Sequence, residues 1–540
     1  MTAPHGLQMI WSSLAISRYY PLTLTTFWFQ RRLWGLNPMP YHLVTIALHA
    51  LNGVLVYLVL RRLRVPAAWL AAMLWTLHPV NVESVAWITE LKNTQSGCFF
   101  FLAVLCFLRS EEGAARRWYA LALLCGAAAL LSKPSTVILP LALLLCVWWQ
   151  RRRWRWLEML RIAPFVGMAV AMSALTVIEQ RGQILRAGTG EWKLVTADRL
   201  VIASKAVLFY ASKLLWPVPL MFVYPRWNLE TGSFLSWLPW LGLVAAGIVL
   251  WFWRREPWAR AGMFGGGFFV VALLPVLGFF NVFYFRYSFV ADHFQYLASV
   301  GLIALAASGA AMTCERIGPR ARCLGTAGAA LTLIALAALT WKQGRIYRNM
   351  EGLWRDTLAK NPRCWMAHTN LGNLYQISGR ISEAREQYEE ALRIKPDYDM
   401  AHNNLAVTLI AAGQPDEAIR ELELALRIKP DLVEAEDNLA WLLATLPPAE
   451  GGDPTRAVEL AQRSCALTGN RAAANLNTLA VAYAAAGRFD DAVAAAQKAL
   501  DLARSAGQRK LIGEIEAQLE LYRGGRATPS STDMIAPSRP

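Results

Sequence analysis

Residues 367–396 read AHTNLGNLYQISGRISEAREQYEEALRIKP, and residues 401–430 read AHNNLAVTLIAAGQPDEAIRELELALRIKP. The two stretches align without a gap, and the small residues Ala384 and Ala418 stand 34 positions apart. Apolar residues recur at helical spacing in both halves of each stretch. A period of this length indicates stacked supersecondary units, so we expect two helices per unit, with small residues where the two helices approach each other.

Two more units follow. The third is stretched by the loop LPPAEGGDP, which places Ala457 39 residues after its counterpart in the second unit, and the fourth places Ala492 a further 35 residues on. Together with Leu371-Gly372 and Tyr375, this pattern is a signature of tetratricopeptide (TPR) repeats. Four repeats are enough to stack into a continuous α-solenoid, which presents a concave face to proteins or peptides. We expect about four repeats over 362–523.

Residues 1–342 have a different composition. They hold 31 Lys and Arg against 12 Asp and Glu, whereas residues 343–540 hold 23 against 26. Charged residues make up 17% of the chain, below the roughly 25% of an average soluble protein. An apolar, basic half joined to a balanced, repetitive half excludes a single soluble domain, a disordered chain and a nucleic-acid binder with charge spread over its surface. We expect a linker at 343–361 and a disordered, Pro/Ser-rich tail at 524–540.

The apolar segments of 1–342 predict a polytopic membrane domain, because a helix needs about 20 mainly apolar residues to cross a bilayer. The stretch LVIASKAVLFYASKLLW at 200–216 contains two lysines, and we expect an interfacial amphipathic helix there. The predicted fold class is all-α, a polytopic membrane helix bundle followed by a TPR α-solenoid. We predict about ten transmembrane helices, near 42–60, 66–79, 94–108, 118–132, 134–149, 162–178, 235–253, 262–280, 289–311 and 323–342.

Arginines mark alternate loops between these segments, in five clusters that begin at Arg61, Arg109, Arg151, Arg254 and Arg316. Positive residues stay on the cytoplasmic side of a membrane, so these five loops are predicted to be cytoplasmic. With ten crossings, the first loop and the repeats then lie on the external side.

The external loops carry cations of their own, which include Arg226 and Arg286. Two interpretations stay open for them: a basic cleft for an anionic headgroup such as a lipid-linked phosphate, or pairing with lipid headgroups at the interface. His42, His49 and Asn52 lie on one face of the first helix by their spacing. This polar stripe in the membrane either bonds neighbouring helices or lines a groove for a lipid substrate.

The sequence predicts no metal site. The eight cysteines are scattered without a CxxC pair, whereas zinc sites need paired spacing. His368 and His402 recur at one position of adjacent repeats, and we interpret them as groove or packing residues.

Three longer stretches of the membrane half resemble one family. They are RYYPLTLTTFWFQRRLWGLNPMPYHLVTIALHAL (18–51), LHPVNVESVAWITELKN (77–93) and FRYSFVADHFQYLASVGLIAL (285–305). They look like the transmembrane and TPR-repeat-containing (TMTC) O-mannosyltransferases and their bacterial relatives, and the resemblance runs from residue 5 to about 520. It implies a GT-C-type glycosyltransferase with a polyprenyl-phosphate sugar donor, an external active site and transfer to a protein hydroxyl.

The sequence departs from the family pattern at one point. Such transferases use an acidic residue in the first external loop to activate the acceptor, and here no Asp or Glu precedes Glu83. The family also has a membrane helix before this loop, so we expect the chain to be N-terminally truncated. Glu83 and Glu90, in the second external loop, are then the candidate catalytic carboxylates. Pairing of these carboxylates with Lys92 or an arginine is the alternative.

The leaving phosphate of the donor needs cations or hydrogen-bond donors. We expect Arg286, Asp292 and His293, in the stretch FRYSFVADH, to bind and orient it together with Arg226. A plain intramembrane ion pair is the alternative for these residues.

The leading hypothesis is a protein O-glycosyltransferase of a bacterial plasma (inner) membrane, with external, periplasmic repeats that bind the acceptor or another protein partner. The chain as it stands either keeps this activity or has lost it with the upstream helix and acid. The alternative is a non-catalytic membrane scaffold, and a transporter is disfavoured because no pair of matched broken helices is present. No cofactor is implied beyond the polyprenyl-phosphate sugar as donor substrate. Membrane lipids and an acceptor protein are the expected partners, and nucleic acid is not.

Overall fold

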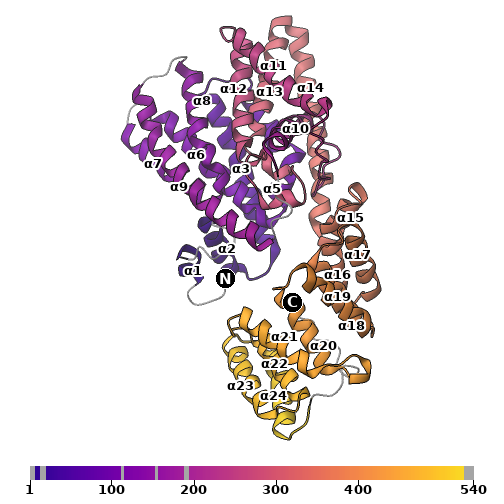
Figure 1. The fold of residues 1–540 in the computed structure, drawn as a ribbon. Coiled ribbons are helices and arrows are strands. Elements are labelled where there is room, and N and C mark those ends of the chain that lie inside the picture. The colour runs from indigo at the N-terminus through magenta and orange to yellow at the C-terminus, as the bar shows by residue number, and fades with distance from the viewer. Residues whose placement is uncertain (1–5, 13–19, 111–114, 152–155, 188–193, 528–540) are drawn as a thin grey trace. The chain divides into compact units, whose positions relative to one another are not determined.

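The structure is a computed structural model that describes residues 6–12, 20–110, 115–151, 156–187 and 194–527. These residues form helices and loops, without a strand among them, as Figure 1 shows. The predicted all-α class is confirmed. The chain divides into two compact units, Met1–Leu353 and Trp354–Pro540. Of the tail predicted at 524–540, residues 528–540 lie outside the described residues.

The first unit contains the helices α1 to α14 (Figure 1). Their bounds are Gly6–Ser12 (α1), Pro21–Trp34 (α2), Pro38–Arg62 (α3), Ala68–Thr76 (α4), Val82–Ala86 (α5), Leu91–Arg109 (α6), Ala115–Ser132 (α7), Leu139–Arg151 (α8), Trp156–Ala187 (α9), Thr196–Leu215 (α10), Leu238–Phe252 (α11), Pro257–Leu273 (α12), Ser299–Ile317 (α13) and Pro319–Gly344 (α14).

The sequence accounts for several of these helix starts. Proline occupies the first turn of α3, α12 and α14, where its missing N–H costs nothing and its fixed φ suits the helix. Before α3, the Asn37 side chain accepts a hydrogen bond of 3.1 Å from the N–H of Met39 and so caps the helix.

Eight helical stretches of the described residues are long and apolar enough to cross a membrane. Two of the ten predicted segments, near 66–79 and 118–132, are not among them and correspond to α4 and α7. The nine residues of α4 extend only about 13 Å, and α7 begins with Arg116 and Arg117, which shorten its apolar part. The stretch predicted as interfacial forms α10, which is also not among the eight. The eight stretches are Pro38–Arg62, Ile88–Arg109, Pro134–Arg151, Glu158–Gly182, Phe234–Phe252, Pro257–Val276, Ser299–Ile317 and Pro319–Arg348.

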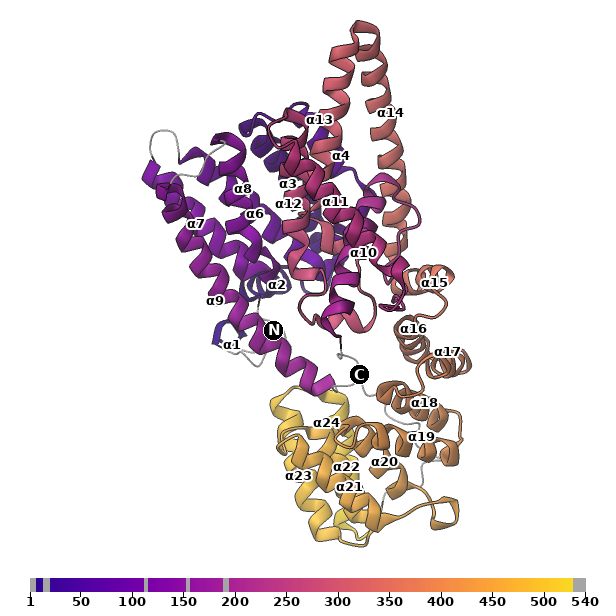
Figure 2. The ribbon, with the colours of Figure 1, turned by 45° about the horizontal axis from the view of Figure 1, so that its top comes forward.

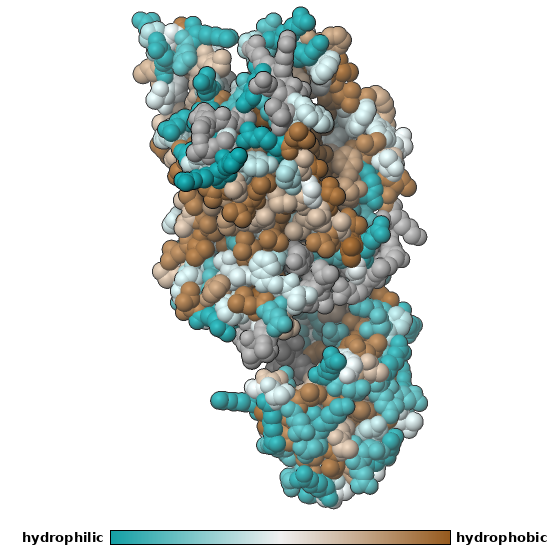
Figure 3. All heavy atoms as spheres, turned by 90° about the vertical axis from the view of Figure 1, so that its left-hand side faces the viewer, coloured by the Kyte–Doolittle hydropathy of each residue, from teal (hydrophilic) through white to brown (hydrophobic). Residues whose placement is uncertain are grey.

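Apolar side chains fill the interior of this unit and also cover part of its surface. Trp75, Phe107 and Tyr296 are buried, whereas Ile248 of α11 and Leu331 of α14 are 51% and 69% exposed. Figure 3 shows apolar side chains gathered in a band across this unit, with hydrophilic side chains at its border. Such a band is the surface that a bilayer covers.

The ends of several helices bring basic residues to one face. A hollow of about 620 Å³ joins the last turns of α3, α6 and α8. Arg260, just inside α12, donates a hydrogen bond of 3.0 Å to the carbonyl of Trp148 in α8. Arg61, Arg109 and Arg260, from three of the loops predicted to be cytoplasmic, therefore lie on the same face. The hollow is lined by Leu58, Arg61, Arg62, Leu63, Arg64, Leu105, Arg109, Trp149 and Gln150.

The second unit is a stack of helix pairs, seen in Figure 2. The predicted linker at 343–361 is mostly helical, since it contains the 3-10 turn η9 (Arg345–Arg348) and α15 (Met350–Lys360). The repeat pairs and the last helix are Trp365–Ile377 (α16), Ile381–Ile394 (α17), Asp399–Ala411 (α18), Pro415–Ile428 (α19), Val433–Thr445 (α20), Pro454–Leu467 (α21), Ala473–Ala485 (α22), Phe489–Ser505 (α23) and Arg509–Arg523 (α24).

Small residues let the two helices of each pair approach, as the period predicts. A Cβ atom added to Gly372 in α16 would lie 2.7 Å from Cε1 of Tyr388 in α17, so only glycine fits beside this ring. The alanine that recurs in the second helix of each pair is fully buried at all four positions, Ala384, Ala418, Ala457 and Ala492.

Candidate functional site

Glu83 and His293 meet in the interior of the first unit. Glu83 lies in α5, and His293 lies in the 3-10 turn η8 (Asp292–Gln295). Nδ1 of the His293 ring is 2.8 Å from Oε1 of Glu83, and the backbone N–H of His293 donates to Oε2 at 3.0 Å. Both side chains are buried. The carboxylate holds the imidazole at two points and favours the tautomer with its proton on Nδ1, which leaves Nε2 as the acceptor nitrogen.

Glu90 lies beside Glu83 and His293, and together these buried residues form a cluster. Nζ of Lys92 lies 2.6 Å from Oε1 of Glu90, and Nζ of Lys133 lies 3.9 Å from Oε2. Asn93 donates to Oε2 of Glu90 at 2.7 Å and to the carbonyl oxygen of His293 at 3.0 Å, and Lys133 donates to Oδ1 of Asn93. Two ammonium groups thus balance the charge of Glu90, and Asn93 ties this ion pair to η8.

Asp292 is the third buried carboxylate of the cluster. The hydroxyl of Tyr224 lies 3.0 and 3.2 Å from its two oxygens, and the N–H of the neighbouring Ala291 donates to the hydroxyl of Tyr210 at 3.1 Å. Burial, together with the negative charge of Asp292, raises the pKa of Tyr224 well above its usual 10. The Tyr224 hydroxyl therefore stays protonated and donates a hydrogen bond to Asp292.

Arg226 and Arg286 lie against the loop that leads into Asp292. The guanidinium of Arg286, at the end of the 3-10 turn η7 (Phe283–Arg286), is 5.4 Å from the ring centre of Phe283. The guanidinium of Arg226 is 5.1 Å from the ring centre of Phe289. The structure therefore brings Glu83, Asp292 and His293 together, and it places the two arginines on the rings of Phe283 and Phe289, which precede Asp292 in the sequence.

The polar stripe of α3 makes contacts between helices. Nδ1 of His49 is 2.8 Å from the hydroxyl of Tyr296, and Nε2 is 3.0 Å from the carbonyl oxygen of Thr76. Asn52 donates to the carbonyl oxygen of Thr94 at 2.8 Å. His49 and Asn52 are buried, whereas His42 is half-buried. The geometry matches the interhelical alternative at His49 and Asn52, because a polar group inside a membrane bundle needs such a partner.

Lys133, Asn93 and Tyr224 are not among the site residues predicted from the sequence. Lys133 stands alone between two apolar segments, and a lone cation in a membrane domain has to face the bundle interior or the interface, so this signal was available. Asn93 and Tyr224 occur in no recurring pattern, and only the tertiary structure brings them to the carboxylates.

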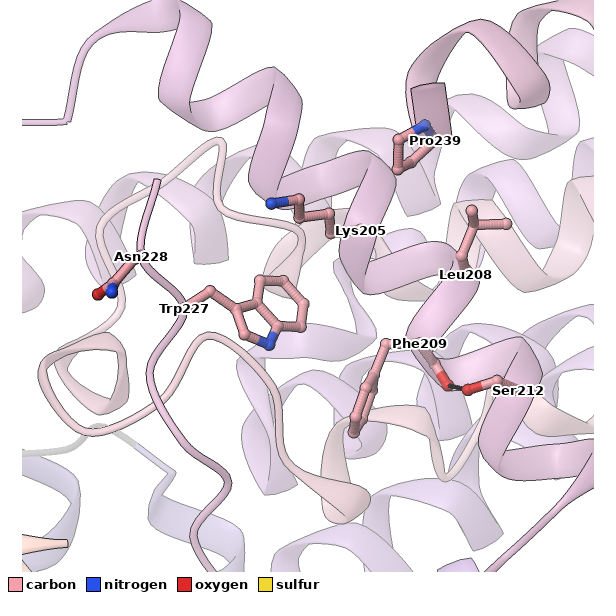
Figure 4. Close-up of a pocket in the computed structure, with 7 residues that line it drawn as sticks. All are labelled: Lys205, Leu208, Phe209, Ser212, Trp227, Asn228 and Pro239. Atoms are coloured by element: carbon pink, nitrogen blue, oxygen red, sulfur yellow. Dashed lines mark hydrogen bonds between the residues drawn. The ribbon is translucent and has the colours of Figure 1, made fainter. Parts of the chain in front are cut away.

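An open groove of about 530 Å³ lies beside the cluster (Figure 4). The ring of Phe209, which lines it, packs edge-on against the ring of Tyr224 at 4.8 Å. Pro239 lies in the first turn of α11, a candidate membrane span. The groove therefore opens where a candidate membrane span begins. The ring of Phe209 separates it from Tyr224, the hydrogen-bond partner of Asp292. It is lined by Lys205, Leu208, Phe209, Ser212, Trp227, Asn228 and Pro239.

The recurring histidines of the repeats hold helices together. His368 contacts the side chain of Gln387 at 2.9 Å through Nδ1 and the carbonyl oxygen of Pro362 at 3.0 Å through Nε2. His402 makes the same pair of contacts with Glu421 and the carbonyl oxygen of Pro396, at 2.6 and 2.9 Å. Within the described part of the chain, no group of three His, Cys, Asp or Glu side chains is placed to hold a metal ion.

Two known families match parts of this chain. The family described as "Dolichyl-phosphate-mannose-protein mannosyltransferase" matches residues 21–178, a range that contains Glu83 and Glu90. The family described as "Tetratricopeptide repeat" matches residues 334–399, 376–442 and 473–506.

Curated relatives match this chain over stretches of different length. "Protein O-mannosyl-transferase TMTC4" of Homo sapiens is 26% identical over 439 residues, which cover 70% of this chain and 58% of that protein. A "Protein O-mannosyl-transferase" of Caenorhabditis elegans is 22% identical over 409 residues, which cover 72% of this chain and 55% of that protein. "Protein O-mannosyl-transferase TMTC2" of Mus musculus is 33% identical over 105 residues, which cover 18% of this chain and 13% of that protein.

The chain thus spans less than two thirds of the curated relatives that it matches. The alignment with human TMTC4 is longer than either compact unit of this chain, so it includes residues of both. The resemblance drawn from the sequence is confirmed: the chain is similar to the TMTC protein O-mannosyltransferases, with a match to the mannosyltransferase family in its first unit and to tetratricopeptide repeats in its second.

Proposed function

We propose that this chain is a membrane glycosyltransferase of the GT-C type, which transfers a sugar from a polyprenyl-phosphate donor to a hydroxyl of an acceptor protein. One observation carries the proposal. Glu83 bonds His293 across 210 positions of sequence, inside a buried cluster that also contains Glu90 and Asp292. Buried carboxylates and a histidine that converge in this way are the groups that proton transfer needs.

The Glu83–His293 pair is the proposed proton acceptor. The acceptor oxygen forms a bond with C1 of the sugar, and its proton passes to Nε2 of His293. The bond from C1 to the phosphate oxygen breaks, and its electron pair leaves with the polyprenyl phosphate. Glu83 keeps the imidazole oriented and stabilises the cation that forms on it, as a carboxylate does for the histidine of a catalytic triad.

Cations near the cluster would stabilise the leaving phosphate. Arg286 lies on the loop that leads into Asp292, Arg226 contacts Phe289 of the same loop, and Lys205 lies in the groove beside Tyr224. The groove combines this ammonium with the apolar walls of Leu208 and Trp227, a lining that suits a phosphate attached to a hydrocarbon chain. We therefore assign the donor lipid to this groove.

The basic face and the cluster lie at opposite ends of α3. Thr45, near the start of α3, donates to the carbonyl oxygen of Val85 in α5 at 2.9 Å, whereas Arg61 and Arg62 end the helix at the basic hollow. Sixteen residues of helix extend about 24 Å. If the basic face is cytoplasmic, the cluster is external. We place the protein in a bacterial plasma membrane, with the repeats periplasmic and holding the acceptor.

A transfer assay tests this function. The full chain in detergent is given a radiolabelled polyprenyl-phosphate mannose and a Ser/Thr-rich peptide, and label on the peptide is counted. We expect transfer by the wild type and its loss in Glu83→Gln and His293→Ala. Glu158→Gln is the matched control, because Glu158 is a buried carboxylate paired with Arg151 in α8. A folded wild type that transfers no sugar would favour the non-catalytic scaffold.

A further inference from the structure

The basic hollow at the ends of α3, α6 and α8 lies outside the machinery proposed for sugar transfer. Sixteen residues of α3 separate Arg61, which lines the hollow, from Thr45, whose hydroxyl contacts α5 beside the cluster. A helix of this length extends about 24 Å. The hollow measures about 620 Å³, which is within the range of roughly 300–1,000 Å³ for pockets that bind small molecules. Its lining therefore needs an explanation of its own.

The described lining of the hollow combines four arginines with apolar side chains and contains no Asp or Glu. The guanidinium of Arg61 lies 5.4 Å from the ring centre of Tyr57, and that of Arg109 lies 4.8 Å from the ring centre of Trp118. In the described part of the chain, neither of these two arginines pairs with a carboxylate, and Arg64 does not either. An aromatic ring attracts a guanidinium without using all of its N–H donors, so donors are left for an anion.

Arg64 has an unusual backbone conformation where α3 ends. Its φ is 56°, in the left-handed region that residues other than glycine rarely adopt. The N–H of Arg64 donates to the carbonyl oxygen of Arg61, and the N–H of Val65 donates to that of Leu60, both at 3.0 Å. These two bonds form a Schellman cap, whose left-handed position usually holds glycine. An arginine stays here at a conformational cost, which points to a use for its side chain.

Helix C-termini attract cations, but the helix ends around the hollow already have hydrogen-bond donors. The N–H of Ser110 donates to the carbonyl oxygen of Cys106 at the end of α6, at 2.9 Å. At the end of α8, Arg260 donates to the carbonyl oxygens of Trp148 and Trp149. The end of α3 has its Schellman cap. The charges differ as well: three helix ends supply about −0.5 each against four arginines, so about 2.5 positive charges are left.

The hollow lies where three candidate membrane spans end. Leu58 and Leu105, which line it, lie one turn inside the spans of α3 and α6. The indole N–H of Trp149 donates to the carbonyl oxygen of Leu63 at 2.9 Å, and a ring of this kind suits the level of the lipid headgroups. A ligand can thus place its charge on the arginines and its hydrocarbon on the leucines. The three spans are Pro38–Arg62, Ile88–Arg109 and Pro134–Arg151.

We propose that the basic hollow binds an anion with two phosphate groups, which the headgroup of a phospholipid with two phosphodiesters supplies. A guanidinium binds a phosphate through two parallel N–H···O bonds, so four arginines suit two phosphates. The two negative charges of such a headgroup nearly balance the charge left in the hollow. A soluble diphosphate offers the same groups without acyl chains, and the leucines at the hollow favour the lipid. Basic pockets between membrane helices bind headgroups of this kind.

Competition binding on the full chain in a neutral detergent tests the hollow. The probe is dye-labelled cardiolipin, which has two phosphodiesters, and its fluorescence anisotropy is read without sugar donor or acceptor peptide, so the result does not depend on sugar transfer. Because its two phosphates are linked, unlabelled cardiolipin should displace the probe at least about threefold more effectively than phosphatidylglycerol at equal phosphate concentration. Phosphatidylcholine should not displace it. Displacement by pyrophosphate at lower concentration than by cardiolipin would support the diphosphate chemistry and assign it to a soluble ligand.

Three variants and a control locate the site. Arg61→Gln and Arg109→Gln should each weaken cardiolipin binding about 3- to 10-fold. Arg64→Gly should weaken it as much, and it gives the left-handed position its usual residue. Its melting temperature without lipid should therefore equal or exceed that of the wild type, which separates lost binding from misfolding. Arg254→Gln/Arg255→Gln is the matched control, because it removes two exposed arginines between α11 and α12 that do not line the hollow, and it should bind within about twofold of the wild type.

Three results would overturn the proposal. One is equal displacement by cardiolipin and either of the other two lipids, which would mean that paired phosphates are not recognised. Another is wild-type affinity in all three variants of the hollow. The third is an equal loss of binding in Arg254→Gln/Arg255→Gln, which would mean that cardiolipin responds to the charge of the whole face and not to the hollow.

Discussion

The Glu83 carboxylate holds both the ring Nδ1 and the backbone N–H of His293, at 2.8 and 3.0 Å. This double contact connects α5 to η8, which are distant in sequence. It fixes the ring as well as the chain that carries it, so the pair is preorganised before any substrate arrives.

Glu83→Gln should separate the chemical role of this contact from its structural role. Both the backbone N–H and the Nδ1–H of His293 donate to Glu83, whereas a glutamine side chain has one acceptor oxygen and one NH₂ donor. The glutamine would therefore set a donor against a donor, and its neutral amide cannot stabilise an imidazolium. We expect sugar transfer to fall by about 10²–10⁴-fold, with a loss of about 1–3 kcal/mol in the free energy of unfolding. Transfer assays and thermal melts on the same preparations check both. Unchanged transfer would remove the pair from the proposed site.

Glu90 and Lys133 should show coupled effects on stability. Their side chains are 1% and 16% exposed, and removing one partner of a buried ion pair leaves the other charge uncompensated. Because Lys92 also contacts Glu90 at 2.6 Å, we expect Lys133→Met to cost about 1–3 kcal/mol. The double variant Glu90→Gln/Lys133→Met should cost less than the sum of the single variants. Additive melting shifts would contradict the coupling.

Tyr224→Phe should weaken the position of Asp292. The variant removes the hydroxyl that lies 3.0 Å from Oδ1 of Asp292 and keeps the ring that packs on Phe209. We expect a loss of about 1–3 kcal/mol in stability and slower sugar transfer. Tyr284→Phe is the control, because its hydroxyl donates to a carbonyl oxygen, that of Phe222, at 3.1 Å. An equal loss of transfer in both variants would argue against a special role for Asp292.

The repeats could be predicted closely from the sequence because each one uses the same local contacts. The period of 34 residues indicated which alanines face the partner helix, and Ala384 and Ala418 are indeed fully buried. The number of membrane spans stays a prediction, since α4 and α7 are not among the eight described stretches that are long and apolar enough to cross a membrane.

The candidate site could be predicted only in part. Residue type and the family resemblance point to Glu83, Asp292 and His293, but no local pattern shows that Glu83 contacts His293 across 210 positions. Such pairing depends on how the helices pack.

The orientation of the membrane unit makes a prediction about the repeats. If the face that carries Arg61 and Arg109 is cytoplasmic, an even number of crossings places the repeats outside. Protease added to spheroplasts should then cut within 354–540, and a cytoplasmic marker protein should stay intact as the control. Repeats that are cut only after the cells are lysed would contradict the external assignment.

The stability of the second repeat should depend on pH through His402. Burial lowers the pKa of His402, but the hydrogen bonds to Glu421 and to the carbonyl oxygen of Pro396 outweigh burial and raise it above the usual 6.5. A raised pKa means that the folded protein holds the proton more tightly than the unfolded one. The stabilisation is therefore complete below about pH 6.5 and is lost as pH rises through the folded-state pKa.

Glu421→Gln removes the charged partner of His402, so it should cost up to about 1 kcal/mol at pH 5.5 and progressively less toward pH 8.5. Hydrogen exchange of the backbone amides in α18 and α19 measures this local free energy of opening. Glu389→Gln is the matched control, because Glu389 pairs with Arg385 at 2.6 Å, and an arginine stays charged over this range. A cost of Glu421→Gln that stays constant from pH 5.5 to 8.5 would mean that His402 does not change its charge there.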